Sequence, residues 1–140
     1  VMQVLALVGF STLVFRTDFG APLPLAMAVL ALVVLAASFG IFITSWLKNT
    51  KQAGVVYGGV MTVIGMTGMS SVFTAGGPGA TGGLMKTLPL IVPQGWAVHT
   101  WRLVMDGASA SDILLPFGVM IVLGAVSFMI GILRFRNRFT

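Results

Sequence analysis

The chain has no cysteine and no glutamate, and it has few charges of either sign. Its 140 residues include 8 Lys or Arg, 3 acidic residues, all of them Asp, and 1 His. The absence of cysteine excludes disulfides, thiolate metal sites and cysteine nucleophiles. A single histidine and three dispersed aspartates do not make a ligand set or a catalytic group. We therefore expect no metal site, no cofactor and no catalytic residue in this chain.

The low charge content is matched by long apolar runs. Charged residues make up 8% of the chain, hydrophobic residues 57%, and the mean hydropathy is +1.04. Soluble domains contain about 25% charged residues. Four runs carry no charged residue, at about 1–15, 23–47, 53–74 and 116–133. We predict an all-α integral membrane domain over residues 1–140, with these four runs as transmembrane helices.

The first run is short for a bilayer core of about 30 Å. No charged n-region precedes it, so it does not have the pattern of a signal peptide. It looks like a span whose beginning is missing, and we expect the chain to be the C-terminal part of a longer protein. Proton-coupled carriers usually need an ionisable residue inside a span. The four runs contain none, which argues against an autonomous proton-driven pump.

Charges are distributed unequally between the two sets of connections. One set holds five basic residues: Lys48, Lys51, Arg134, Arg136 and Arg138. The other holds three basic residues and every acid: Arg16, Lys86, Arg102, Asp18, Asp106 and Asp112. Because Lys and Arg concentrate on the cytoplasmic side, we predict that both ends of the chain are cytoplasmic and that segment 75–115 faces outward. The net charge of +5 does not indicate nucleic acid, since the basic residues are too few and too dispersed.

The outward segment contains short elements that cannot span a bilayer. Five glycines and a proline in Gly76–Gly83 predict a loop, and no lysine follows to complete a phosphate-binding motif. Leu84–Val92 is apolar but short, with Pro89 inside it. In Trp96–Met105 the apolar side chains predict a short helix at the membrane interface: Val98, Trp101 and Met105 on one face, with His99, Thr100 and Arg102 opposite. Ser109, Ser111 and Asp112 are expected to cap the last helix.

The third run is rich in glycine and methionine. Small residues let membrane helices approach closely, and Gly54 and Gly58 have the spacing that this packing uses. One interpretation is a close-packed helix. Another is a helix that lines a path for an apolar substrate, because methionine adapts to varied shapes. The positions concerned in either case are Gly54, Gly58, Met61, Gly65, Met66 and Met69.

Several motifs in order resemble one family. Phe39-Gly40 and Leu47–Ala53 look like a span that ends in a Lys-x-x-x-Gln-Ala turn, and Leu88–Ala97 looks like a Pro-x-x-Trp segment. Trp101–Gly107 matches the stretch that follows, and Ser111–Leu114 leads into a last span with an Arg-Phe-Arg-x-Arg-Phe ending. Together these resemble the membrane subunit of ATP-binding-cassette (ABC) transporters of the ABC-2 type, the permeases of many bacterial exporters.

The resemblance implies six spans per subunit, of which these four runs would be the last. It also implies a second permease subunit, a separate or fused ATPase, and a bacterial or archaeal plasma membrane. The outer segment would be a re-entrant or interfacial helical hairpin, with gate residues Pro89, Pro93, Trp96, Trp101 and Arg102. The substrate would be hydrophobic or amphiphilic. The alternative is a non-transporting anchoring or assembly subunit, which has no need of such a hairpin.

Overall fold

The described part of the chain consists of helices and their connections. The computed structural model describes residues 2–17, 19–47, 50–74 and 88–139. In these ranges it contains no strand, and the all-α prediction is confirmed. The elements are α1 (Met2–Phe15), α2 (Pro22–Trp46), α3 (Thr50–Thr74), the 3₁₀ helix η1 (Leu88–Ile91), α5 (Pro93–Met105) and α6 (Ala110–Phe139). The predicted loop Gly76–Gly83 and the residues Asp18, Lys48 and Lys86 lie outside the described residues.

Three helices are long and apolar enough to cross a membrane. The candidate spans are Pro22–Trp46, Ala53–Ser70 and Ala110–Arg136. Helix α1 has 14 residues. At about 1.5 Å per residue it is about 21 Å long, short of a hydrocarbon core of about 30 Å. The structure thus supports a membrane protein with three candidate spans among its described residues, and the predicted count of four is not confirmed.

The start of α6 differs from the sequence prediction. We predicted a span that begins at Pro116, but the helix begins at Ala110. At this end the Ser109 hydroxyl and backbone N–H both donate to the Asp112 carboxylate, at 2.6 and 3.0 Å, and the Asp112 N–H donates to the Ser109 carbonyl at 3.1 Å, so the first turn forms before Pro116. The predicted cap is confirmed for these two residues, and the Ser111 hydroxyl bonds to that of Ser109 at 2.7 Å. Pro116 lies buried inside the helix, where it removes one backbone hydrogen bond.

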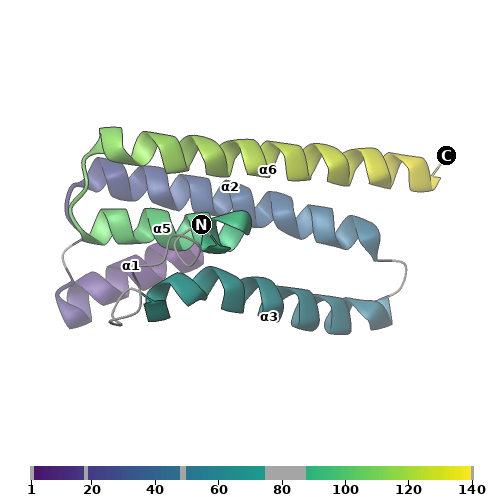
Figure 1. Cartoon of the computed structure of the whole chain (residues 1–140), viewed down its shortest axis with the longest axis horizontal. Coiled ribbons are helices and arrows are strands. Elements are labelled where there is room, and N and C mark those ends of the chain that lie inside the picture. Colours follow the sequence, from purple (N-terminus) through teal and green to yellow (C-terminus); the bar gives the residue numbers. More distant parts are fainter. Residues whose placement is uncertain (1, 18, 48–49, 75–87, 140) are drawn as a thin grey trace.

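Helices α2 and α6 run parallel and side by side, with α6 along one edge of the fold (Figure 1). Ala28 of α2 shares a buried cluster with Ile113 of α6. Seven residues further on, Leu35 shares a second cluster with Met120, seven residues after Ile113. The contacts therefore advance in the same direction along both helices.

Two glycines of α6 allow the pair to come close. A Cβ at Gly124 would lie 3.3 Å from the Val34 side chain, and one at Gly131 would lie 3.1 Å from the Ile41 side chain. Both distances are shorter than an ordinary van der Waals contact, so a side chain at either position requires its neighbour on α2 to shift by a few tenths of an ångström. Close approach of this kind replaces the hydrophobic driving force that helices lack in lipid.

The C-terminal halves of α2 and α6 end at the same end of the bundle. The guanidinium of Arg134 stacks over the Trp46 ring, 3.8 Å from its centroid. Helix α3 runs back in the opposite direction (Figure 1). The connection from α3 to α6 therefore leaves and returns at one end, as predicted for a segment that does not cross the membrane.

Helix α3 is tied to α2 close to the turn between them. The Tyr57 hydroxyl donates to the Gly40 carbonyl at 3.1 Å and bonds to the Thr44 hydroxyl at 2.5 Å. Beyond this point α3 leaves α2 and packs chiefly against α5 and η1.

Candidate functional site

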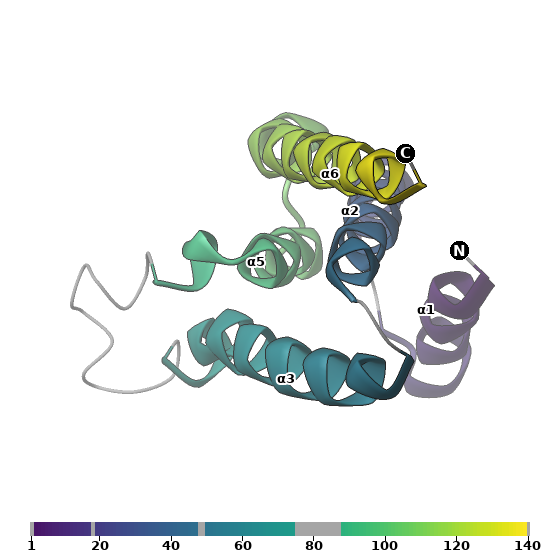
Figure 2. The ribbon, with the colours of Figure 1, turned by 90° about the vertical axis from the view of Figure 1, so that its right-hand side faces the viewer.

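Helix α5 lies between α3 on one side and α2 and α6 on the other, and η1 packs against α5 and α3 (Figure 2). Near the start of α5, Trp96 packs on Leu35 and Met120. Near its end, Val104 packs on Ala28. Leu35 is close to the middle of the 25-residue α2, whereas Ala28 is close to its start. Helix α5 therefore runs from about half the depth of the candidate spans to one end of them.

A tight turn joins η1 to α5. The Val92 N–H donates to the Pro89 carbonyl at 3.3 Å, the Gly95 N–H donates to the Val92 carbonyl at 3.0 Å, and the Trp96 Nε1–H donates to the Leu90 carbonyl at 2.8 Å. A Cβ at Gly95 would lie 1.7 Å from the Pro89 carbonyl oxygen. Only glycine fits at this position, because real Cβ atoms do not approach another atom closer than about 3 Å.

The buried face of α5 is not the one predicted from its periodicity. Thr100 and Val104 are almost fully buried, each 1% exposed, whereas Met105 is 49% exposed. The Thr100 hydroxyl is satisfied: it donates to the Trp96 carbonyl at 2.7 Å and lies 3.4 Å from the Met120 sulfur. The predicted buried face is wrong because α5 packs among three helices. The positions that face those helices hold small side chains or polar side chains with a hydrogen bond.

Gln94 is the polar residue that the sequence did not single out. It sits in the first turn of α5, and its buried Oε1 has no hydrogen-bond partner. Opposite it lies α3: a Cβ at Gly68 would be 3.0 Å from the Gln94 Cβ, and one at Gly65 would be 4.0 Å from its Oε1. An unpaired buried acceptor is unfavourable by about 1–3 kcal/mol. The only sequence signal for this contact is the Pro-Gln-Gly-Trp order, in which Gly95 follows Gln94.

The predicted gate residues lie along η1 and α5. Pro89 is fully buried in η1, and Pro93 occupies the first turn of α5. Trp101 is half-buried and meets Phe19 edge to face, with ring centroids 5.9 Å apart. The Arg102 side chain is half-buried and forms no hydrogen bond or ion pair with another described residue. These residues and Trp96 therefore lie on two consecutive elements, η1 and α5. Their gating role stays a prediction.

The predicted α3 residues differ in exposure along the helix, since Gly54 and Gly58 share a face with Gly65 but lie about two to three turns nearer the start of α3, away from α5. Gly54 and Gly58 are exposed, and nothing lies within 4 Å of a Cβ built on either of them. Met66 and Met69 are also exposed, at 72% and 49%. Met61 is half-buried, like Gly65 on the side that meets α5. The close packing predicted at Gly54 and Gly58 is not formed within the described chain, so it stays a prediction about a neighbouring molecule.

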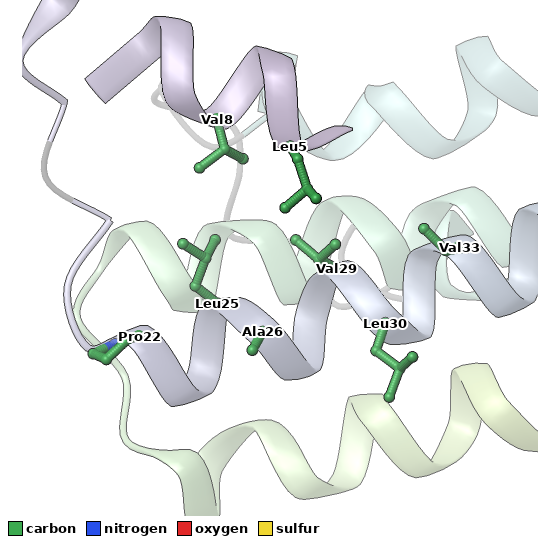
Figure 3. Close-up of a pocket in the computed structure, with 8 residues that line it drawn as sticks. All are labelled: Leu5, Val8, Pro22, Leu25, Ala26, Val29, Leu30 and Val33. Atoms are coloured by element: carbon green, nitrogen blue, oxygen red, sulfur yellow. The ribbon is translucent and has the colours of Figure 1, made fainter. Parts of the chain in front are cut away.

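Helix α1 packs loosely against the other helices, and two grooves run alongside it. It has no buried residue. A groove of about 360 Å³ separates it from α2, where Leu5 and Val8 point toward Leu25 and Val29 (Figure 3). A second groove of about 380 Å³ lies between α1 and the side chains of Leu32, Trp101 and Met105.

The surface of the described residues is mainly apolar, and it shows no cluster of side chains suited to catalysis or metal binding. Within residues 2–17, 19–47, 50–74 and 88–139, no three His, Asp or Glu side chains come together. No family model, curated protein or solved structure matches this chain. The assignment of a function therefore depends on the geometry of η1 and α5 and on the order of the sequence motifs.

Proposed function

We propose that this chain is part of the permease subunit of an ATP-driven exporter of the ABC-2 type. The observation that supports the proposal best is the position of η1 and α5. They enter the bundle to about half the depth of the candidate spans and leave at the same end. An anchoring subunit needs only spanning helices. A transport subunit needs an element that closes the path at one side, and alternating access requires two arrangements of such an element.

In this proposal α1 is one of the last four of six spans, as the resemblance implies. The basic end, where α2 and α6 terminate together, faces the cytoplasm of a bacterial or archaeal cell. The η1–α5 segment then opens from the outer side, as the re-entrant hairpin expected from the resemblance. Pro89 and Gly95 shape the turn at its tip, and Trp96 fixes the tip to α2 and α6.

The exposed face of α3 supports a path shared between two subunits. Met66 and Met69 are exposed, and the open surface over Gly54 and Gly58 can receive a second helix. No acidic or basic residue lies within the Ala53–Ser70 candidate span. A path lined by such a helix suits a hydrophobic or amphiphilic substrate, because methionine and glycine surfaces adapt to apolar shapes.

The test is purification of the full-length protein from its native membrane in mild detergent, followed by identification of what accompanies it. The proposal expects an ATPase subunit in near-equal amount, or an ATPase domain in the same polypeptide, with ATP hydrolysis stimulated by amphiphilic compounds. A Trp96→Phe variant should keep the complex together and lose most of the stimulation, since the ring remains while its hydrogen bond to the Leu90 carbonyl is lost. Val126→Phe, on the exposed surface of α6, is the matched control.

If no ATPase accompanies the protein and none is fused to it, the exporter has no energy source. The anchoring or assembly subunit is then the better assignment. A protein with an ATPase partner whose hydrolysis is indifferent to every amphiphile and to Trp96→Phe would contradict the assigned role of η1 and α5.

A further inference from the structure

The grooves beside α1 are joined to a polar pocket at its C-terminal end. This pocket, of about 440 Å³, is lined by Thr12, Arg16 and Thr17 together with apolar residues of the following turn and α2. It shares Pro22 and Leu25 with the groove of Figure 3. Two apolar grooves and one pocket that contains polar residues therefore lie beside α1.

The second groove meets the same pocket on the other side of Val8, a residue of α1 that lines both grooves. It shares Thr17 and Phe19 with the pocket, and Val8 with the first groove. Both grooves therefore adjoin the same pocket. A phospholipid has a similar arrangement, since its two acyl chains extend from one polar headgroup.

Arg16 is available for a ligand in this pocket. Its side chain is exposed and makes no hydrogen bond, ion pair or ring contact with another described residue. Its backbone is in the left-handed region, with φ of 52°, where the chain turns away from α1. A guanidinium binds phosphate through two parallel hydrogen bonds, and the Thr17 hydroxyl on the same pocket adds a polar group.

The depth of the first groove matches one leaflet of a bilayer. It extends along α2 from Pro22 to Val33. At about 1.5 Å per residue this is about 16 Å, close to half of a hydrocarbon core of about 30 Å. The polar pocket lies at the start of α2, which is the level of the headgroups if α2 spans the membrane.

We propose that these three spaces bind one glycerophospholipid, with its phosphate on Arg16 and one acyl chain in each of the two grooves that meet at Val8 of α1. The site requires only that α2 crosses a membrane, and it does not depend on transport. The bound lipid fills the space between α1 and the bundle, and so provides the buried contacts that α1 lacks among the described residues.

The experiment is a titration of the delipidated full-length protein with dioleoyl-phosphatidylglycerol in detergent, read by native mass spectrometry. We expect one tightly retained lipid per chain. Arg16→Gln keeps a β-carbon, and therefore the same backbone preference, but should weaken binding about fivefold, whereas Arg16→Lys should weaken it less. Arg136→Gln removes the same charge at the other end of the bundle and should leave binding within about twofold of the unchanged protein.

Filling the first groove tests the acyl-chain part of the site. Val29→Trp, and the milder Val29→Phe, should weaken lipid retention about fivefold or more. Val126→Trp is the matched control, because Val126 is 52% exposed on α6 and away from the grooves. The proposal is overturned if the Val29 variants retain lipid like the Val126 variant, or if Arg16→Gln binds like Arg136→Gln. Val29 variants that keep the lipid but lose a second copy of the chain would assign the groove to a helix of that copy.

Discussion

Replacing Gly95 with alanine should open the turn between η1 and α5. The new Cβ would stand 1.7 Å from the Pro89 carbonyl oxygen and 2.3 Å from its carbonyl carbon. Both are backbone atoms, so the clash cannot be relieved by rotating a side chain. Opening the turn breaks the Val92–Pro89 and Trp96–Leu90 hydrogen bonds, worth about 1 kcal/mol each. Overpacking adds about 1–3 kcal/mol, and we expect the free energy of unfolding to fall by about 3–5 kcal/mol.

The assay is thermal unfolding of the full-length protein in mild detergent, followed by circular dichroism and tryptophan fluorescence. The loss corresponds to a decrease in the unfolding temperature of about 10 °C or more. Gly118→Ala on α6 is the control: nothing lies within 4 Å of its Cβ, and alanine favours a helix over glycine by about 0.5–1 kcal/mol. The described close approach would be refuted if Gly95→Ala unfolded within about 2 °C of the unchanged protein with the same fluorescence.

Four further changes test separate parts of the fold. Gly58→Leu should allow membrane insertion but abolish function, because its side chain would occupy the surface offered to a second subunit; full activity in a substrate-resistance assay would contradict this. Gly68→Leu should instead lower the unfolding temperature of the isolated chain, since it meets Gln94 at 3.0 Å, and equal melting of the two leucine variants would argue against that contact. Ser109→Ala removes the hydroxyl that donates to the Asp112 carboxylate and should lower the free energy of unfolding by about 1 kcal/mol, with no change expected if the helix starts at a later residue. Met120→Ala should lower it by about 2–5 kcal/mol, because Met120 is fully buried; a change below about 1 kcal/mol would show that the cluster around it is loose.

Charge-free apolar runs identify membrane helices well because the penalty for a buried charge acts on every residue of a span. The run at 23–47 became α2 (Pro22–Trp46), and the run at 53–74 became most of α3. Helix ends are decided by local hydrogen bonds instead. Pro116 is an acceptable first residue for a helix, yet the Asp112 carboxylate accepts the Ser109 N–H and hydroxyl about one and a half turns earlier, and the helix starts there.

The sequence did not predict the contacts between segments that are far apart along the chain. The chain has 18 glycines, and no pattern distinguishes Gly68 and Gly95, which meet backbone, from Gly54 and Gly58, which face open space. The buried face of α5 was missed for a similar reason. An amphipathic pattern assumes lipid on one side and water on the other, whereas Thr100 lies against the sulfur of Met120.

The two attachments of α3 make it a lever. It is held near one end, where Tyr57 bonds to Gly40 and Thr44 of α2, and it bears on α5 at Gly68, about 16 Å further along at about 1.5 Å per residue. Helices α2 and α6 pack closely through Gly124 and Gly131, so they form a rigid pair relative to which α3 can move. A tilt of α3 about its Tyr57 end would displace the first turn of α5, because Gly68 of α3 lies against Gln94.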